Sequence, residues 1–186
     1  MSRTELRPFS YVVLTLVGEE GASAHDVVQM MRRGRAYWTT SPSHYYAEPK
    51  RLAGLGYLDA KEVPGKTNAR TFYTLTSRGH EALADWEREP TPFPRIQSEA
   101  IVRLLGAGES ALPSLLAMHA ELDELEAGLD RADEIAESIP HRTRSLRLVH
   151  RYGRRMVALH REWLDEVEEE LGRGTARKPG ERGDRL

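Results

Sequence analysis

The sequence contains no cysteine among its 186 residues. This absence excludes disulfide bonds, thiol catalysis and thiolate metal sites. No apolar run approaches the roughly 18 residues that a membrane-spanning helix needs. The apolar segment YVVLTLV near the N-terminus is short, is followed by acidic residues and lacks a small-residue cleavage site, so it is a poor signal peptide. We therefore expect a cytoplasmic protein that does not contact membranes.

Motifs for catalysis and metal binding are also missing. The seven histidines are scattered, and none has the His-Glu-x-x-His spacing of a metal site. His150 and His160 fall on one predicted helix, but almost three turns apart, which is too far to share a metal ion. The chain has no G-x-S-x-G nucleophile, no P-loop and no dinucleotide-binding glycines. These absences predict a protein that is not an enzyme and needs no metal or cofactor.

Charge is distributed unevenly along a chain whose net charge is only -2. Between residues 32 and 78, nine Lys or Arg stand against three Asp or Glu, a local charge of +6. The segments ELDELE (121–126) and DEVEEE (165–170) are acidic. A basic segment in a near-neutral chain indicates either a surface for nucleic acid or a merely solvated face.

Three helices are predicted in the first part of the chain. An apolar helix over residues 8–20 begins with a proline, which the first turn tolerates. Ser23 caps a second helix, with Asp26 three residues later as in a capping box, and Gly34 ends it. A third helix starts at Ser-Pro (41–42), a good N-cap followed by a good first residue, and ends near two glycines.

A β-hairpin and a fourth helix follow. Strand-forming stretches at 57–63 and 70–75 flank PGKTNA, which has turn chemistry. Thr76 or Ser77 then caps a helix that Pro90 closes. Three helices, a hairpin and a helix, in this order, predict a winged helix-turn-helix.

The third helix has a proline, Pro49, at its centre. A proline inside a helix costs about 3 kcal/mol because it removes a hydrogen bond and clashes with the preceding turn. Ser-Pro at 41–42 is nevertheless a better helix start than Glu-Pro at 48–49, because Glu is a poor N-cap. We predict one helix across Pro49, with a start at Pro49 as the alternative. We also hypothesise that Pro49 kinks the helix and so sets the angle at which residues 42–47 would meet DNA.

The second half of the chain predicts long helices. The prolines of TPFP indicate a linker, and SEAIVRLLGAG is a short helix. From Ser110 onward, apolar residues alternate three and four positions apart, as in a helix with a long partner: Leu115, Met118, Leu122, Leu125, Leu129, Ala132, Ala136 and Ile139. After a turn at Pro140, the apolar face of the last helix is predicted to consist of Val149, Tyr152, Met156, His160, Trp163, Val167 and Leu171.

Two long antiparallel helices give little core by themselves. We therefore predict a homodimer through the C-terminal helices, with an intramolecular hairpin covered by the short helix as the alternative. The fold class is mainly α with a small β-wing. The domains expected are a winged helix-turn-helix over 1–90, a linker over 91–97, a helical dimerisation domain over 98–171 and a disordered tail over 172–186.

Several motifs, in order, resemble the PadR family of bacterial transcriptional regulators. They are YVVLTLV, GASAHDVVQMM, SPSHYYAEPKRLAGLGYL with its Ser-Pro, Tyr, Lys-Arg-Leu and Gly pattern, and RTFYTLTSRGHEAL with its Tyr-x-Leu-Thr-x-x-Gly ending. The C-terminal half resembles that family's helical domain down to REWLDEVEEEL, so the resemblance spans roughly residues 7 to 171. It implies a homodimeric DNA-binding regulator, usually a repressor, often released by a small molecule such as a phenolic acid or a flat drug.

The helix-turn-helix motif suggests which residues meet DNA. The second helix of such a motif lies in the major groove, with its first turns at the base edges. Helical spacing puts Tyr45, Pro49 and Leu52 on the core side. The predicted DNA-binding residues on the opposite side and on the wing are Ser43, His44, Tyr46, Lys50, Arg51, Lys66, Thr67, Asn68 and Arg70. Two units related by a two-fold axis would bind double-stranded DNA at a palindromic operator.

Trp38, Trp86 and Trp163 are candidates for a pocket that binds a small aromatic effector; core or interface packing is the alternative for each. An alternative function also stays open. The chain could be a dimeric small-molecule-sensing or protein-interaction module whose winged helix does not bind DNA, an interpretation that Glu48 and Pro49 in the third helix would favour.

Overall fold

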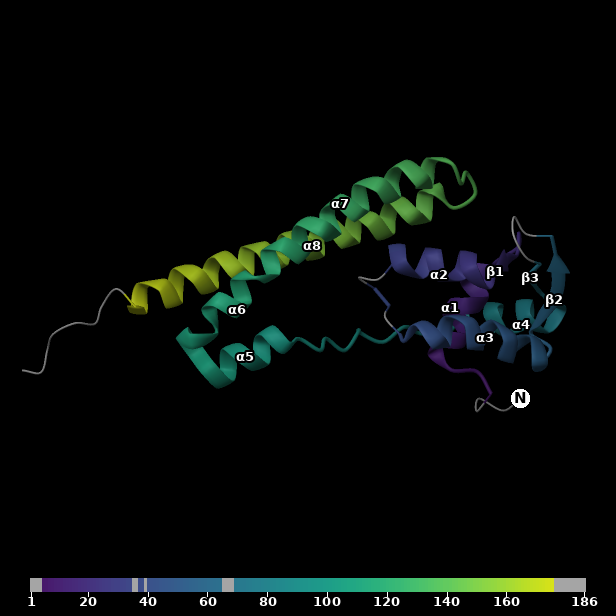
Figure 1. Ribbon diagram of the computed structural model, residues 1–186, viewed down its shortest axis with the longest axis horizontal. Coiled ribbons are helices and arrows are strands. Elements are labelled where there is room, and N and C mark those ends of the chain that lie inside the picture. The colour runs from purple at the N-terminus through teal and green to yellow at the C-terminus, as the bar shows by residue number, and fades with distance from the viewer. Residues whose placement is uncertain (1–4, 35–36, 39, 65–68, 176–186) are drawn as a thin grey trace, which may run out of the picture. The chain divides into compact units, whose positions relative to one another are not determined.

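The computed structural model describes residues 5–34, 37–38, 40–64 and 69–175 (Figure 1). The chain forms two compact units, Met1–Phe93 and Pro94–Leu186. Their boundary falls within the segment 91–97 that the sequence suggests as a linker. Residues 90–98 have no regular structure, and Phe93 and Ile96 are exposed there.

The first unit contains four helices and a small sheet. Its elements, in chain order, are α1 (Pro8–Val17), β1 (Ala22–Ser23), α2 (Ala24–Arg33), α3 (Pro42–Gly54), β2 (Leu58–Val63), β3 (Arg70–Leu75) and α4 (Ser77–Glu87). The predicted winged helix-turn-helix is confirmed, with α2 and α3 as its two helices and β2–β3 as the wing.

Local capping explains where α2 and α4 begin, whereas Ser41, which precedes α3 as predicted, makes no side-chain capping bond. The Ser23 hydroxyl accepts a hydrogen bond from the Asp26 backbone N–H, and the Asp26 carboxylate accepts one from the Ser23 N–H at 3.0 Å, so the predicted capping box is confirmed. Thr76 caps α4 in the same way, accepting from the Gly79 N–H at 3.0 Å. The predicted end of α1 is wrong, because the helix stops at Val17 and turns at Gly18.

The sheet has an additional short strand that the sequence did not predict. Its order is β1-β3-β2, antiparallel throughout, with Ala22 opposite Tyr73 and Leu58 opposite Leu75. Gly21 makes the approach of β1 possible. It has a positive φ, and a Cβ there would collide with the Phe72 ring and the Tyr73 carbonyl.

The core of this unit joins all of its helices to the wing. Its fully or almost fully buried apolar residues are Val13, Leu14, Val17, Ala22, Val27, Met31, Leu52, Tyr57, Leu58 and Tyr73. Pro49 and Leu52 are buried and Tyr45 is half-buried, which confirms the core side predicted for α3. The helix continues across Pro49, so a start at Pro49 is excluded, whereas the kink stays a hypothesis.

The second unit is all-helical. Its elements are α5 (Glu99–Ala107), a 3-10 turn η1 (Gly108–Ala111), α6 (Leu112–Leu116), α7 (Met118–Glu137) and α8 (Thr143–Thr175). The prediction of one helix from Ser110 is wrong, because Pro113, which lacks an N–H, lies in the first turn of α6 and a new helix starts there. The predicted apolar spacing of α7 holds, with Leu122 and Ala136 buried and Leu125 and Leu129 packed beside them.

The inner face of α8 differs from the prediction. The residues it buries against the rest of the unit are His150, Gly153, Val157, Leu164 and Val167. Of the predicted face, Val167, Leu171 and Trp163 do pack in this core, but Val149 and Tyr152 are exposed. The sequence misled because His150 and Gly153 are not apolar. His150 is accommodated by a 2.6 Å contact between its Nδ1 and the Asp133 carboxylate.

The last helix also runs further than predicted, to Thr175, so the predicted tail begins within α8. The rest of that tail, 176–186, lies outside the described residues. Among the described residues, no single helix is long and apolar enough to cross a membrane. Glu99–Leu116 and Met118–Glu137 reach that length and composition only as a pair bent by 47°.

A candidate DNA-binding surface

The outer face of α3 carries most of the residues predicted to meet DNA. Ser43, His44, Tyr46 and Lys50 are all exposed, and Tyr46 is 52% exposed. The side chains near the start of the helix form short-range contacts. The His44 Nδ1 lies 3.0 Å from the Thr40 hydroxyl, and the hydroxyls of Ser41 and Ser43 are 3.0 Å apart. The first turns of α3 therefore present hydroxyl, imidazole and phenol groups, with an ammonium group one turn later.

The sequence suggests that Arg51 lies on this outer face, but in the structure its guanidinium is hydrogen-bonded inside the domain. Its Nε and Nη2 donate to the two oxygens of Glu48 at 2.9 and 2.6 Å, and Nη2 also donates to the Ser10 hydroxyl at 3.0 Å. Its Nη1 donates to the Glu5 backbone carbonyl at 2.9 Å. The hydrogen bond to Glu48 raises the pKa of the Arg51 guanidinium. All three of its nitrogens thus have partners within the domain, and the geometry favours an internal role over a DNA contact.

Glu48 is the other half of this arrangement. Its side chain is only 12% exposed, and one of its oxygens accepts a 2.6 Å hydrogen bond from Ser10, which is fully buried in α1. Burial by itself would raise the pKa of the Glu48 carboxyl, but the hydrogen bonds from Arg51 and Ser10 together lower it below its ordinary value. The three-residue spacing of Glu48 and Arg51 could have suggested the ion pair. No local pattern could have revealed Ser10, 38 residues away.

A second cluster ties the end of α3 to α4. Arg78 donates to the Leu55 carbonyl at 2.6 Å and to the Glu5 carboxylate at 2.9 Å. Its guanidinium carbon also lies 4.2 Å from the centre of the Tyr57 ring, within cation–π range. A carbonyl that the helix end would leave without a partner is satisfied in this way.

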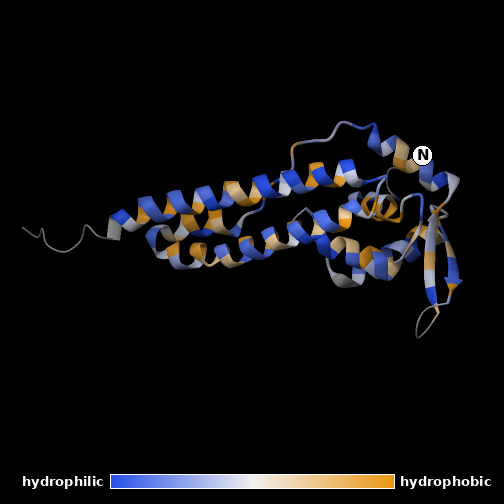
Figure 2. Ribbon diagram, turned by 90° about the horizontal axis from the view of Figure 1, so that it is seen from above, coloured by the Kyte–Doolittle hydropathy of each residue, from blue (hydrophilic) through white to orange (hydrophobic). Residues whose placement is uncertain are grey.

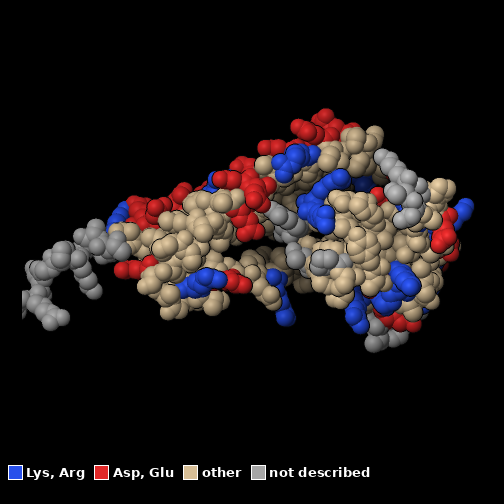
Figure 3. Space-filling model, in the orientation of Figure 1, with Lys and Arg blue, Asp and Glu red and all other residues tan. Residues whose placement is uncertain are grey.

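The wing is described except at its tip. Arg70 begins β3 opposite Val63 and is exposed, as is Lys61 on β2. The predicted tip residues Lys66, Thr67 and Asn68 lie outside the described residues. On the face shown in Figure 3, acidic side chains gather along the long helices of the second unit, while the winged-helix unit carries several Lys and Arg side chains.

The three tryptophans have different surroundings. Trp86 stacks on Tyr11, with ring centres 4.9 Å apart and planes 8° from parallel. Trp38 is exposed in the connection between α2 and α3, and Trp163 packs against the core of the second unit. Packing therefore accounts for Trp86 and Trp163 within their own units, and an effector role for any of the three stays a prediction.

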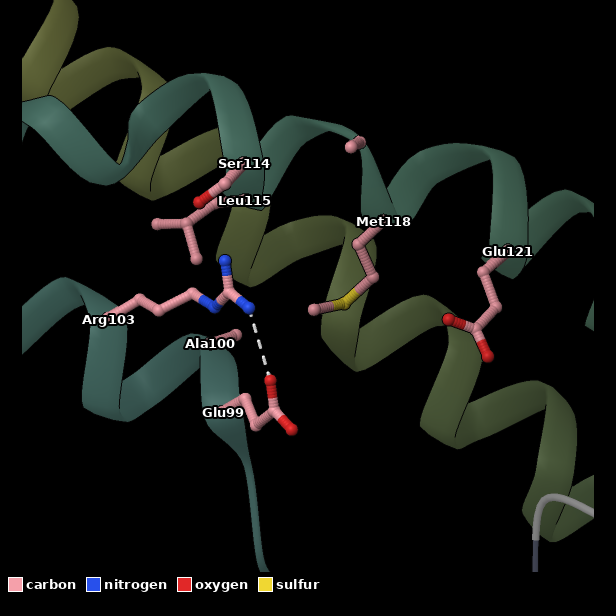
Figure 4. A pocket seen from close by; sticks show the side chains of 8 residues that line it. Glu99, Ala100, Arg103, Ser114, Leu115, Met118 and Glu121 are labelled. Carbon is pink, nitrogen blue, oxygen red and sulfur yellow. Dashed lines mark hydrogen bonds and ion pairs between the residues drawn. The ribbon is translucent and has the colours of Figure 1, made fainter.

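Two cavities formed by described residues of the second unit can be compared with the tryptophans, and neither of the two is lined by one. One, of about 290 Å³, lies between α5 and the α6–α7 segment, where Arg103, paired with Glu99, reaches toward Leu115 and Met118 (Figure 4). The other, of about 430 Å³, is lined by Pro140, Thr143, Arg144, Arg147, Leu148 and Arg151. Within the described part of the chain, no group of three His, Asp or Glu side chains could hold a metal ion.

Fold and site together define a winged helix-turn-helix protein with a C-terminal helical unit built on a long antiparallel hairpin. No protein-family model matches the chain. The negative transcriptional regulator PadR of Bacillus subtilis is 26% identical over 91 residues, which cover 48% of this chain and 50% of PadR. The chain thus matches about half the length of this curated relative, and the resemblance to PadR that the motifs suggest is confirmed.

Solved structures extend the likeness in fold. Bacillus subtilis PadR in complex with operator DNA has a TM-score of 0.71 and 18% identity, covering 90% of this chain and 97% of that one. The same protein in complex with p-coumaric acid has a TM-score of 0.59 and 18% identity, covering 87% and 99%. The Vibrio cholerae virulence activator AphA has a TM-score of 0.63 and 20% identity, covering 91% and 99%. The chain therefore has the PadR fold over most of its length.

Proposed function

We propose that the protein is a homodimeric transcriptional repressor that binds double-stranded DNA at a palindromic operator and is released by a small molecule. One observation carries the proposal: α3 presents Ser43, His44, Tyr46 and Lys50 outward while its opposite face is anchored in the core. A relative that is a negative regulator, and whose structure contains operator DNA, supports the same function. Such a function places the protein in the cytoplasm with the DNA.

In the proposed complex, α3 is the recognition helix and enters the major groove with its first turns. Ser43, His44 and Tyr46 meet base edges or phosphates there, and Lys50 neutralises a backbone phosphate. Arg70, with Lys66, Thr67 and Asn68 of the wing, meets a phosphate or the adjacent minor groove. Arg51 is left out of this interface because its donors are bonded inside the domain.

The proposed dimer uses the outer face of α8. A second apolar stripe recurs there at spacings of three and four residues, and Figure 2 shows apolar residues along the length of this helix. The outer stripe consists of the exposed Leu148, Tyr152 and Leu159 and the half-buried Met156 and Trp163, and the Trp163 side chain also packs against the core of its own unit. Leu148, Tyr152 and Leu159 are more than half exposed. An exposed apolar stripe of four turns on a charged helix is typical of an interface.

Charge supports an antiparallel pairing of two α8 helices. Residues 138–161 contain seven arginines and no acidic residue, whereas residues 162–171 contain six acidic residues and no basic one. Antiparallel α8 helices place the basic half of each opposite the acidic half of its partner, and parallel helices place like charges together. The stripe would then be flanked by complementary charges on both sides of the two-fold axis.

The proposed effector is a small aromatic molecule. Support comes from the structure of the PadR relative with p-coumaric acid and from Trp38, the tryptophan for which packing does not account. Isothermal titration of the protein with aromatic acids, followed by the DNA-binding assay with the tightest ligand, tests this part of the proposal. A ligand that binds without changing DNA affinity would contradict the effector role.

Electrophoretic mobility shift with the DNA upstream of the protein's own gene tests the main proposal. We expect binding at physiological salt that weakens steeply as salt rises, because phosphate contacts release counterions. Sequencing of genomic DNA bound in cells would then identify the operator. A folded dimer that shifts no promoter fragment at any salt concentration would contradict DNA binding.

Lys50→Ala and Lys66→Ala variants test the docking orientation. Each should weaken binding to specific and unrelated duplexes alike and reduce the slope of log K against log salt by about one. Their dimerisation, followed by light scattering, should stay unchanged. Normal DNA binding by both variants would show that the orientation is wrong.

Glu48 and Pro49 are the features of α3 that would favour the alternative function, a module whose winged helix does not bind DNA. Glu48 faces Ser10 and Arg51 rather than the outer surface, and Pro49 is buried in the core. Neither residue obstructs the exposed face of α3.

A further inference from the structure

We propose that Glu48 and Arg51 are positioning residues that clamp the recognition helix to α1 through the buried Ser10, and that neither contacts DNA. The inference rests on the proposed DNA-binding function. Glu48, whose negative charge opposes DNA binding, then has a structural role. Arg51 belongs to the contact that holds α3 to α1 and not to the DNA interface.

The clamp joins α1 to α3, which also meet through Phe9 and Tyr45, whose ring centres lie 5.9 Å apart. Ser10 is the third residue of α1, accepts a 3.0 Å hydrogen bond from the Arg7 N–H and donates to Glu48 at 2.6 Å. Arg51 adds bonds to Glu48, to Ser10 and to the Glu5 carbonyl. Hydrogen bonds are directional, so this set favours one rotation of α3 about its axis, whereas apolar contacts depend less on direction.

The clamp also spans the weak point of the helix. Pro49 has no N–H, so the Tyr45 carbonyl loses its usual partner within the helix. Glu48 and Arg51 lie on either side of Pro49, and their ion pair links the residue before the proline to the turn that follows it. Glu48 also bonds to Ser10, so the middle of α3 is held to α1 next to the turn that lacks a hydrogen bond.

An electrostatic role and a positioning role for Glu48 predict opposite effects of Glu48→Gln on operator affinity. This change removes a negative charge close to the DNA-facing helix, so electrostatics alone predicts stronger binding to any duplex. If Glu48 positions the helix, the same change weakens binding to the operator, because a neutral amide cannot accept the bidentate hydrogen bonds of Arg51 as well. The ratio of operator to unrelated-duplex affinity should therefore fall.

The experiment measures that ratio for the full-length dimer over a range of salt concentrations. Glu48→Gln and Ser10→Ala should each lower operator affinity by about tenfold, the equivalent of one charge-assisted hydrogen bond. Affinity for an unrelated duplex should be unchanged or higher for Glu48→Gln. Leu83→Ala in α4, which packs against the same core away from the clamp, controls for lost stability and should retain the operator ratio.

Arg51→Ala and Lys50→Ala form a matched pair of neighbouring cations. The Lys50 change should reduce the salt slope by about one, whereas the Arg51 change should lower operator affinity and leave the slope unchanged. A reduced slope for Arg51→Ala would show that Arg51 contacts a phosphate directly and would overturn the proposal. Tighter operator binding by Glu48→Gln would overturn it as well.

Hydrogen exchange of the DNA-free protein separates this inference from the function on which it rests. Glu48→Gln should speed amide exchange in the middle of α3 and leave α4 unchanged, while Leu83→Ala should do the reverse. Wild-type protein that binds no DNA would contradict the proposed function alone, and the exchange result would still decide the clamp. Unchanged exchange in α3 for both Glu48→Gln and Ser10→Ala would overturn the clamp itself.

Discussion

Gly79 lies where α4 passes over the backbone just before β2. A Cβ at this position would collide with the Tyr57 carbonyl oxygen and press against the Leu75 side chain. This is the glycine of the Tyr-x-Leu-Thr-x-x-Gly motif. The motif could be recognised in the sequence, but its reason, a close approach between helix and backbone, appears only in the structure.

Gly79→Ala should therefore lower the free energy of unfolding by about 1–3 kcal/mol or more, because the neighbouring atom is backbone and cannot move aside easily. Chemical denaturation of the winged-helix unit measures this change. Gly54→Ala, at the last residue of α3 in the same unit, is the matched control, since a Cβ there meets no atom within 4 Å and alanine favours the helix. Equal stability of the two variants would contradict the close approach.

Glu48 also makes stability depend on pH. Its pKa is lowered in the folded state, so its contribution is fully present above the ordinary value of 4.5 and is lost as pH falls through the folded value. Unfolding free energy, measured by urea denaturation from pH 7 to pH 3, should fall more steeply in wild type than in Glu48→Gln below pH 4.5. Parallel curves for the two proteins would show that the carboxylate gains nothing from its partners.

For single helices, the capping residues of α2 and α4 could be predicted from the sequence, but the buried face of α8 could not. The box of Ser23 and Asp26 lies within four residues, so sequence alone located the start of α2. The break between η1, α6 and α7 was missed, because the apolar spacing continues across it. On α8, two apolar stripes run side by side, and hydropathy cannot tell which one the hairpin buries.

Two leucines of α8 test this assignment with the same chemical change. Leu164 is fully buried, and Leu164→Ala should cost the helical unit about 2–5 kcal/mol. Leu159 is 62% exposed, and Leu159→Ala should leave the hairpin itself intact but raise the protein concentration needed for dimerisation. Denaturation at several protein concentrations separates the two effects. A larger loss of monomer stability for Leu159→Ala would reverse the assignment of the faces.

At the scale of the whole molecule, the proposed antiparallel dimer makes a geometric prediction. Single cysteines can be introduced cleanly because the chain has none. Met156→Cys, at the centre of the outer stripe, should form an intersubunit disulfide under mild oxidation, since two-fold related Cα atoms there can come within 7 Å. Leu148→Cys should not, because its two copies would lie roughly 24 Å apart along the helices at 1.5 Å per residue.

A mixture of two single-cysteine variants should form the intersubunit disulfide that Leu148→Cys alone should not form. Leu148→Cys protein mixed with Trp163→Cys protein should form the heterodisulfide, because antiparallel helices centred near Met156 bring these positions together. Cross-linking of Leu148→Cys with itself would indicate parallel helices. Denaturing electrophoresis without reductant reads out every combination.

Sequence alone predicted the order of the four helices and the hairpin in the winged-helix segment, the caps of α2 and α4 and the basic bias of this segment, because these depend on residues close together in the chain. Tertiary structure decided which polar side chains of α3 face outward. Lys50 and Arg51 are adjacent cations, yet Arg51 turns inward because Ser10, 41 residues away in sequence, meets it across the contact with α1. The inner face of α8 likewise depends on packing against α7, where the Asp133 carboxylate is the polar partner of the buried His150.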